Sequence, residues 1–477
     1  YGEDLSTGTT LADRVVSLSG ADAGIAGAYL GDTVATALSG IITATSAGAA
    51  ANAGVAGGPY AITVDLSGAT GNNGYAVALG SNTPRTITVA AKALTASLTG
   101  VSKVYDASNA ATLASGNYVL SGLVGSESFS ITKTSGLFNA SDISASSVSA
   151  TLAAGDFSAG AATFASNYIL PVSATGTGSI TAKALTATLT GVSKVYDGDT
   201  AAVLNGANYQ LVGLVGGQSA SVSQAAGLYN SADVLGANSV SASLSGANFA
   251  AGGGTSLANY ILPTMATGSA SITPKALSAS LTGTIGKTYD GGSGALLGAG
   301  NFSLSGFVGA QSASVTQTAG VYNSVNVATA NSVTASLSAG DFTAGSGTTL
   351  SNYSLPVSAS GSASIAAKSL SASLTGALGR SYDGTAIASL TGGNVALDGV
   401  VAGESINVGT LNGSYDSRNA GTRTVSATLA GGDFTAGSST LLGNYVLPTS
   451  AAGTAVIAPK AITLNAPAIS KVYDRTL

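Results

Sequence analysis

The 477-residue chain has a net charge of -5 and only 8% charged residues, so it has no basic stripe for nucleic-acid phosphates or an anionic membrane surface. It contains no Cys, His or Trp and a single Met, which excludes thiol nucleophiles, disulfides, Cys/His metal sites and imidazole acid–base chemistry. Ser, Thr and Gly interrupt every apolar stretch, so the sequence predicts no membrane span.

The first 91 residues predict a divergent β module. Its last part, from Gly58 to Lys92, ends in the same strand pattern that closes each later repeat. Its start, Tyr1 to Asp4, looks like a variant of the Tyr-Asp corner described below, without the strand that leads into it. We therefore predict that residues 1–91 form a β module lacking its first strand.

Two landmarks then recur about every 92 residues and indicate a tandem array. A lysine that opens an alternating stretch stands at Lys92, Lys183, Lys275, Lys368 and Lys460. The motif Asn-Tyr-x-Leu-Pro stands at 167–171, 259–263, 352–356 and 444–448. These positions predict four repeats at 92–182, 183–274, 275–367 and 368–459, and the start of a fifth at 460–477.

Each repeat has the period-two pattern of half-buried strands. Apolar Leu94, Ala96 and Leu98 alternate with Thr and Ser, and Val148 and Leu152 mark a second strand of the same kind. Further extended stretches cover 117–125, 128–139 and 176–182, while no window shows a helical face. The sequence thus predicts an all-β array of antiparallel β-sandwich-like modules.

The passage from one repeat to the next has no flexible linker. Ile180 and Leu185 lie five residues apart, an odd step that places them on opposite faces of a regular strand, so the stretch serves two cores. Pro274 and Pro459 occupy this point in two copies, and proline cannot donate to a strand ladder, so we expect the ladder to break there. Modules joined head to tail in this way should form a stiff rod.

A Tyr-Asp pair follows the first strand of each repeat, preceded by Lys or Arg. The pairs are Tyr105-Asp106, Tyr196-Asp197, Tyr289-Asp290, Tyr382-Asp383 and Tyr473-Asp474. We interpret them as a structural corner in which Tyr packs at the module edge and Asp accepts backbone N–H groups in an Asx-turn. Because Ala107 and Arg475 replace the glycine of the other copies, glycine geometry should not be required. The cation and the carboxylate need not meet, and a sugar- or ion-binding spot is the alternative.

Other chemistry finds little support in the sequence. Acidic residues do not recur in phase, since the position of Asp156, Asp341 and Asp433 is Asn248 in the second repeat. We therefore predict no cofactor, with calcium in each module as the alternative, and no enzymatic activity.

The repeats, which open with "KALTASLTGVSKVYDG" and close with "NYILP" and "GTGSITAKAL", resemble YDG-type repeats. The first module, with "YAITV", "GYAV" and "RTITVAAK", is similar to the related MBG-type repeats. The resemblance implies a very large bacterial secreted adhesin of the filamentous-haemagglutinin, two-partner-secretion kind. It implies no catalytic residues.

The leading hypothesis is an extracellular structural and adhesive fibre, on the bacterial surface or in a biofilm matrix, that acts as a stalk and bundles laterally. Its partners would be other copies of itself and surface or matrix polysaccharide. One alternative is a set of modules that bind glycans through exposed Tyr and Asn. Another is a head-to-tail polymer in which 460–477 completes the first module of a second copy. The simpler interpretation of 460–477 is that this sequence is part of a longer array of repeats.

Overall fold

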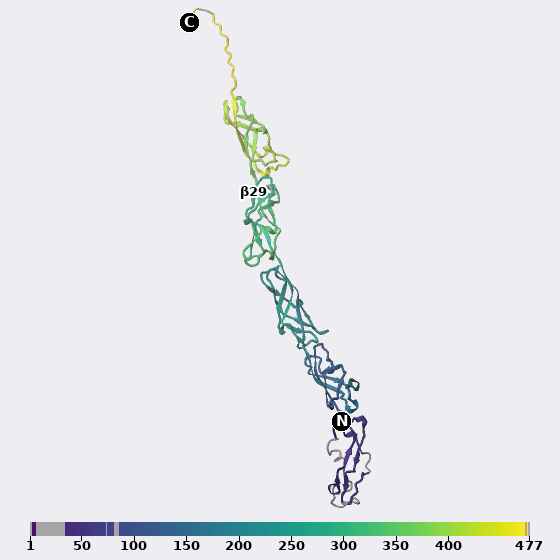
Figure 1. Ribbon diagram of the computed structural model, residues 1–477. Coiled ribbons are helices and arrows are strands. Elements are labelled where there is room, and N and C mark those ends of the chain that lie inside the picture. Colours follow the sequence, from purple (N-terminus) through teal and green to yellow (C-terminus); the bar gives the residue numbers. More distant parts are fainter. Residues whose placement is uncertain (1, 6–33, 73, 81–84, 473–474, 476–477) are drawn as a thin grey trace. The chain divides into compact units, whose positions relative to one another are not determined.

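A computed structural model describes residues 2–5, 34–72, 74–80, 85–472 and 475, and it is all-β as predicted (Figure 1). Apart from one single-turn α-helix and short 3-10 turns, the regular elements of these residues are strands. Among the described residues, no helix has the length and apolar composition that crossing a bilayer would require.

The chain divides into two compact units whose boundary lies inside repeat 2. One unit comprises Tyr1–Thr190, Val203–Ala226 and Ser241–Gly268, and the other comprises Gly191–Ala202, Gly227–Val240 and Ser269–Leu477. For each contact between successive repeats that is described below, both residues lie in the same unit.

The first module contains short strands paired two by two, β1 with β5, β2 with β4, and β3 with β6. Its elements are α2 (Val34–Ala37), β1 (Leu38–Gly40), β2 (Thr43–Thr45), η1 (Ala47–Ala49), η2 (Val55–Gly57), β3 (Tyr60–Ala61), β4 (Thr63–Asp65), β5 (Ala69–Gly71) and β6 (Thr86–Ile87). The expected Tyr1-to-Asp4 corner lies partly outside the described residues.

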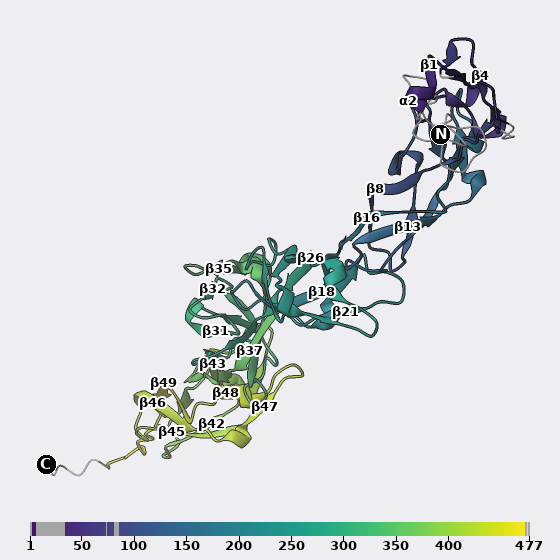
Figure 2. The same ribbon diagram turned by 90° about the horizontal axis from the view of Figure 1, so that it is seen from below.

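Repeat 1 shows the plan of all four repeats. Its elements are β7 (Lys92–Ala93), β8 (Thr95–Val104), β9 (Ala110–Thr112), η3 (Ser115–Asn117), β10 (Tyr118–Ser121), β11 (Phe129–Ile131), β12 (Ser135–Phe138), β13 (Ser147–Thr151), η4 (Ala154–Asp156), β14 (Phe157–Ala159), η5 (Ala165–Asn167), β15 (Tyr168–Ile169) and β16 (Ser173–Thr181). Six strands form a curled sheet in the order β10-β8-β16-β13-β12-β9, and β11 pairs with β14 in a separate ribbon. Figure 2 shows β8, β16 and β13 side by side.

Repeat 2 has the same elements in the same order along the chain. They are β17 (Lys183–Ala184), β18 (Thr186–Val195), β19 (Ala201–Val203), η6 (Gly206–Asn208), β20 (Tyr209–Val212), β21 (Ala220–Val222), β22 (Ala226–Tyr229), β23 (Ser239–Ser243), η7 (Gly246–Asn248), β24 (Phe249–Ala251), η8 (Leu257–Asn259), β25 (Tyr260–Ile261) and β26 (Met265–Thr273).

In repeat 3 the first and last long strands are each interrupted, and its six-stranded sheet has the order β30-β33-β34-β37-β28-β31. The elements are β27 (Lys275–Ala276), β28 (Ser278–Leu281), β29 (Gly286–Thr288), β30 (Gly294–Leu296), η9 (Ala299–Asn301), β31 (Phe302–Ser305), β32 (Ala313–Val315), β33 (Ala319–Tyr322), β34 (Ser332–Ser336), η10 (Ala339–Asp341), β35 (Phe342–Ala344), η11 (Leu350–Asn352), β36 (Tyr353–Ser354), β37 (Ser358–Ser362) and β38 (Ser364–Ala366).

Repeat 4 has the sheet order β42-β45-β46-β49-β40-β43, with β41 also paired to β49. The elements are β39 (Lys368–Ser369), β40 (Ser371–Leu374), β41 (Arg380–Ser381), β42 (Ile387–Leu390), η12 (Gly392–Asn394), β43 (Val395–Asp398), β44 (Ile406–Val408), β45 (Leu411–Tyr415), β46 (Gly421–Thr428), η13 (Gly431–Asp433), β47 (Phe434–Ala436), η14 (Leu442–Asn444), β48 (Tyr445–Val446) and β49 (Ser450–Ala458).

The predicted alternation places the core as expected. In repeat 1, Val148 and Ala150 point into the core while Ser147, Ser149 and Thr151 are exposed. Residues of the β11–β14 ribbon close the other side of the same core. The alternation therefore predicted the buried face correctly, because side chains on a strand point to opposite sides in turn.

The pairing of the first and last strands was not predicted. Most pairs in the sheet are antiparallel, but β8 and β16 run parallel, with Val104 beside Thr181. Because these two strands run in the same direction, the chain enters a repeat at one end of the sheet and leaves it at the other. The corner after β8 therefore lies beside the residue at which the chain leaves for the next repeat, where the N–H of Tyr105 donates to the carbonyl of Thr181.

The strand ladder changes partner between repeats at a single residue, as predicted from the prolines at this point. Strand β16 pairs within repeat 1 up to Thr181, and β17, from Lys183, pairs with β25 of repeat 2. Pro274 occupies the corresponding place between β26 and β27. One residue leaves no slack between the two ladders.

The predicted first strand of a fifth repeat does not form in the described residues. Residues 459–472 contain no strand, and Ile462 and Leu464 are almost fully exposed. The reason is that a leading strand pairs with strands near the end of its own repeat, such as β16 for β8.

Candidate functional site at the repeat joints

The aspartate of each corner accepts backbone N–H groups, as the Asx-turn prediction requires. The Oδ1 atom of Asp106 accepts the N–H of Ser108 at 2.9 Å. Equivalent bonds join Asp197 to the N–H of Asp199, Asp290 to that of Gly292, and Asp383 to that of Thr385. The carboxylate thus closes a two-residue turn.

The preceding cation meets the carboxylate, a contact that the sequence left open. The Nζ atom of Lys103 lies 2.7 Å from Oδ1 of Asp106, and the Nζ atom of Lys287 lies 2.6 Å from Oδ1 of Asp290. The turn folds the chain back and so brings positions i and i+3 together. The hydrogen bond from Lys287 lowers the pKa of the Asp290 carboxyl, with help from the N–H of Gly292 and against the effect of partial burial.

An aromatic ring holds the other side of each cation. The Nζ atom of Lys103 lies 5.7 Å from the ring centroid of Phe138, within the range of a cation–π contact. Tyr229, Tyr322 and Tyr415 hold the corresponding cations of repeats 2, 3 and 4. The corner cation therefore neutralises the aspartate of its own turn. No group of three or more acidic side chains suited to a metal ion occurs in the part of the chain that the structure describes.

The residue after the aspartate has a left-handed backbone in every described copy. The φ angle is +88° at Gly198, +79° at Gly291 and +83° at Gly384, but also +65° at Ala107 and +55° at Arg475. Our expectation that glycine geometry is not required was therefore wrong. The turn requires the left-handed conformation, and Ala107 adopts it despite its side chain.

We expect Ala107→Gly to stabilise repeat 1 by about 0.5 kcal/mol, because relief of roughly 1–2 kcal/mol of backbone strain is partly offset by the greater freedom of the unfolded chain. The matched reverse change, Gly198→Ala, should destabilise by about 1–2 kcal/mol. Urea unfolding of both variants checks this, and equal effects of the same sign would contradict it.

The corner tyrosine is buried against the next repeat. Tyr105 is only 5% exposed, and its ring meets that of Tyr260 edge to face, with centroids 5.4 Å apart. Gln218 joins the two phenols: its Nε2 donates to the Tyr105 hydroxyl at 2.7 Å, and its Oε1 accepts from the Tyr260 hydroxyl. Tyr260 belongs to the Asn-Tyr-x-Leu-Pro motif, so the two sequence landmarks meet in one joint.

The next two joints repeat this cluster. Tyr196 pairs with Tyr353 through Gln311, and Tyr289 pairs with Tyr445 through Glu404, with ring centroids 5.3 and 5.4 Å apart. The third joint thus has a carboxylate in place of the amide.

The asparagine of the same motif forms the second half of each joint. Asn352 is 1% exposed; its Oδ1 accepts the N–H of Val234 at 2.8 Å and its Nδ2 donates to Asp233 at 2.6 Å. The equivalent bonds run from Val55 to Asn167, from Ile143 to Asn259 and from Val327 to Asn444. Because the partners of each bond belong to different repeats, the bonds form only when the repeats are docked. A buried polar group left without a partner costs about 1–3 kcal/mol, so these bonds favour the docked state.

A valine of the next repeat packs on the corner glycine. A Cβ atom placed on Gly198 would lie 3.0 Å from Cγ1 of Val308, and one on Gly291 would lie 3.0 Å from Cγ1 of Val401. At these two joints the corner residue must therefore be small as well as left-handed, whereas a Cβ atom on Gly384 would meet nothing within 4 Å.

The third joint should weaken at alkaline pH. Burial, and then the hydrogen bond to Glu404, raise the pKa of Tyr289 to about 12, from 10.0. A raised folded-state pKa gives stability that is complete below pH 10 and is lost as the pH rises towards 12. Thermal unfolding followed by circular dichroism across this range checks the loss. Tyr289→Phe should show a smaller dependence on pH, and an identical dependence would contradict the assignment.

Two predicted corners differ from the rest. Tyr382 is 37% exposed, although Asp383 makes the same turn and pairs with Arg380. Tyr473 and Asp474 lie outside the described residues. The joint cluster is therefore seen for Tyr105, Tyr196 and Tyr289.

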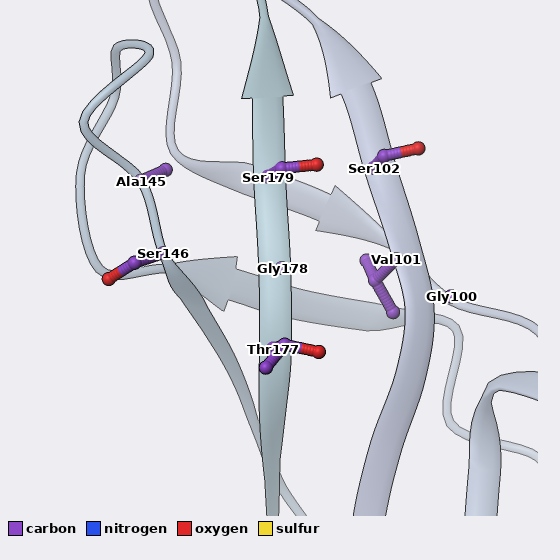
Figure 3. Close-up of a pocket in the computed structure, with 8 residues that line it drawn as sticks. All are labelled: Gly100, Val101, Ser102, Ala145, Ser146, Thr177, Gly178 and Ser179. Atoms are coloured by element: carbon purple, nitrogen blue, oxygen red, sulfur yellow. The ribbon is translucent and has the colours of Figure 1, made fainter.

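The sheet of repeat 1 also has an open hollow between β8, β16 and the loop before β13 (Figure 3). Its lining consists of Gly100, Val101, Ser102, Ala145, Ser146, Thr177, Gly178 and Ser179. None of these side chains is charged, so the hollow has no acid, base or activated nucleophile of its own.

Sequence reasoning missed the Gln and Glu of the joints. They stand three residues after the recurring valine, at Glu127, Gln218, Gln311 and Glu404. Their recurrence in phase was visible in the sequence, but Gln218, Gln311 and Glu404 each also bind a tyrosine of the preceding repeat, which no local pattern indicates.

A protein-family model described as "YDG domain" matches residues 83–177, 181–267, 273–362 and 366–453. No curated protein matches the chain. Among solved structures, the tetra-tandem repeat in the extending region of a large adhesion protein has 14% identity and a TM-score of 0.17, covering 77% of this chain and 99% of that one. The I9-I11 tandem from titin has 9% identity and a TM-score of 0.16, covering 57% of this chain and 100% of that one. At these TM-scores neither likeness bears on the fold.

Proposed function

The chain belongs to the YDG domain family, and from this premise we propose that its tandem repeats are the stiff structural spacer of a bacterial adhesin on the cell surface or in a biofilm matrix. The repeats would hold a binding region away from the cell and would catalyse no reaction. Secretion by a two-partner route, with function outside the cell, is part of the proposal.

The joint is the observation that supports a stiff spacer. A single residue separates the ladders of successive repeats, and two sets of hydrogen bonds, from the tyrosine pair and from the motif asparagine, join the two repeats there. Bending at the joint would expose the tyrosine pair and leave the asparagine bonds unmade. A flexible linker of Gly and Ser would have no such cost.

Spin labels in neighbouring repeats test this stiffness. The chain has no cysteine, so Leu296→Cys and Ile387→Cys, both at exposed sites, label repeats 3 and 4 alone. We expect a narrow distribution of distances between the labels, and a broad one when a Gly-Ser segment is inserted after Ala367, between the ladders. The same insertion after Gly432, which has open space around it, is the control. Equally broad distributions in all three proteins would contradict a stiff spacer.

Lateral bundling is the second part of the proposal. The exposed faces of strands such as β13 and β34 are formed by Ser and Thr without charge. Neighbouring copies would repel each other weakly and meet through many small hydrogen bonds. Bundles should then persist in moderate salt, as light scattering or sedimentation can measure, and their dissociation by salt would contradict this.

Glycan binding by the repeats is the competing function. The corner tyrosines 105, 196 and 289 and the motif asparagines are buried in the joints, so a sugar could reach them only if the repeats separated. A glycan array with the full chain tests it. Saturable binding that survives Tyr196→Phe would favour a glycan site elsewhere on the repeats.

A further inference from the structure

Each of three joints places two tyrosines in contact with one bridging side chain. The ring centroids of Tyr289 and Tyr445 lie 5.4 Å apart, and their hydroxyls donate to the two oxygens of the Glu404 carboxylate. The two rings meet edge to face, and their hydroxyl ends converge on one carboxylate, so the carbons next to the hydroxyls belong to the converging ends of the rings. Oxidised phenols couple at these carbons.

The composition directs oxidation to tyrosine. The chain has 18 tyrosines but no Cys or Trp and one Met, Met265, which is exposed on β26. Thiols, indoles and thioethers are the side chains that usually react with oxidants before phenols do. With these nearly absent, a one-electron oxidant is left with tyrosine as its main target.

We propose that the joints are sites of oxidative cross-linking, at which the paired tyrosines couple into dityrosine and join successive repeats covalently. The oxidant is a one-electron oxidant, such as the oxidised form of a peroxidase acting with hydrogen peroxide. The inference does not depend on the spacer role, because it concerns the chemistry of the joint alone.

The reaction balances as a two-electron oxidation. Each phenol loses one electron to the oxidant and its hydroxyl proton to a base, which yields two tyrosyl radicals. The radicals form one C–C bond between their ortho carbons, and the hydrogens on those carbons move to the oxygens and restore both phenols. The net loss is two electrons and two protons, and one molecule of hydrogen peroxide accepts them to become two waters.

The bridging residue should make the tyrosine pairs of the three joints couple at different rates. At the third joint both hydroxyl protons point at the Glu404 carboxylate, since the Tyr445 oxygen already accepts the N–H of Val401. Glu404 is only half-buried, so a proton that it accepts can pass to water. At the second joint Gln311 donates to the Tyr196 hydroxyl at 2.8 Å and cannot accept its proton. Tyr289 and Tyr445 should therefore couple first.

The full-length chain, exposed to a photo-excited ruthenium tris-bipyridyl complex with persulfate, tests this. We expect dityrosine fluorescence in monomeric chains, and, after proteolysis, a linked peptide containing Tyr289 and Tyr445 that lacks two hydrogen atoms. Linked peptides from the other two joints should form more slowly. Tyr118 and Tyr209 are internal controls, because their hydroxyls donate to the backbone carbonyls of Lys133 and Gln224.

A pair of reciprocal variants isolates the bridging residue. Glu404→Gln should slow coupling at the third joint by about tenfold, below the roughly 10²–10⁴-fold that a positioned base gives in enzymes, and Gln311→Glu should speed coupling at the second joint. Tyr445→Phe keeps the ring but should abolish the third-joint link alone, with circular dichroism confirming the fold. The proposal is wrong if the joint peptides stay unlinked, if Tyr118 and Tyr209 couple as readily, or if neither reciprocal variant changes the rates.

Discussion

Tyr196→Ala is expected to destabilise the joint between repeats 2 and 3 by about 3–5 kcal/mol, the usual cost of removing a buried aromatic side chain. The change leaves a cavity beside Tyr353 and removes the hydroxyl to which Gln311 donates. The free energy of opening can be measured by native-state hydrogen exchange of amides near the joint.

Tyr382→Ala is the matched control, because this tyrosine stands in the same motif but is 37% exposed. Its effect should stay within about 0.5 kcal/mol, as for other surface substitutions. Similar losses for the two variants would mean that the tyrosine acts within its own repeat and not across the joint.

Gly361→Ala is the second change with a large expected effect, a loss of about 3 kcal/mol or more. A Cβ atom at this position would lie 2.2 Å from the carbonyl oxygen of Leu281, on the neighbouring parallel strand. A backbone atom cannot move aside as a flexible side chain can, so β37 and β28 would have to separate. Gly176, Gly268 and Gly453 meet the carbonyls of Leu98, Leu189 and Leu374 in the same way.

Gly300→Ala is the control for this change, since a Cβ atom there meets nothing within 4 Å and the backbone needs no positive φ. It should be neutral or stabilise by up to about 0.5 kcal/mol. Urea unfolding of the two variants measures the difference. A loss below about 1 kcal/mol for Gly361→Ala would show that the parallel strands are not packed as closely as the structure indicates.

Some features of this protein could be predicted from local sequence patterns, and others could not. The strands, the all-β fold and the break of the ladder between repeats could be predicted, because each follows from a pattern within a few residues. The tandem repeats could be predicted because two landmarks recur in phase along the chain. The Asx-turn of Asp106 was also predictable, since a carboxylate that accepts an N–H two residues later needs no other part of the chain.

Only part of the candidate site could be predicted from the sequence. The Tyr-Asp corner and the Asn-Tyr motif were recognised as separate landmarks, and nothing local indicated that Tyr105 and Tyr260 touch. The left-handed angle at Ala107 was likewise hidden, since alanine replaced the residue that would have signalled it.

Alternation and turn chemistry thus determined the elements of this protein, where each repeat begins and which face of each strand is buried. The tertiary structure decided the parallel pairing of β8 with β16, the position of the corner beside the exit of the chain, and the partner of each joint tyrosine in the following repeat. The reason is physical: strand periodicity and turns arise from neighbouring residues, whereas the joints arise from side chains more than a hundred positions apart, such as Tyr105 and Gln218. Only the folded chain brings such residues together.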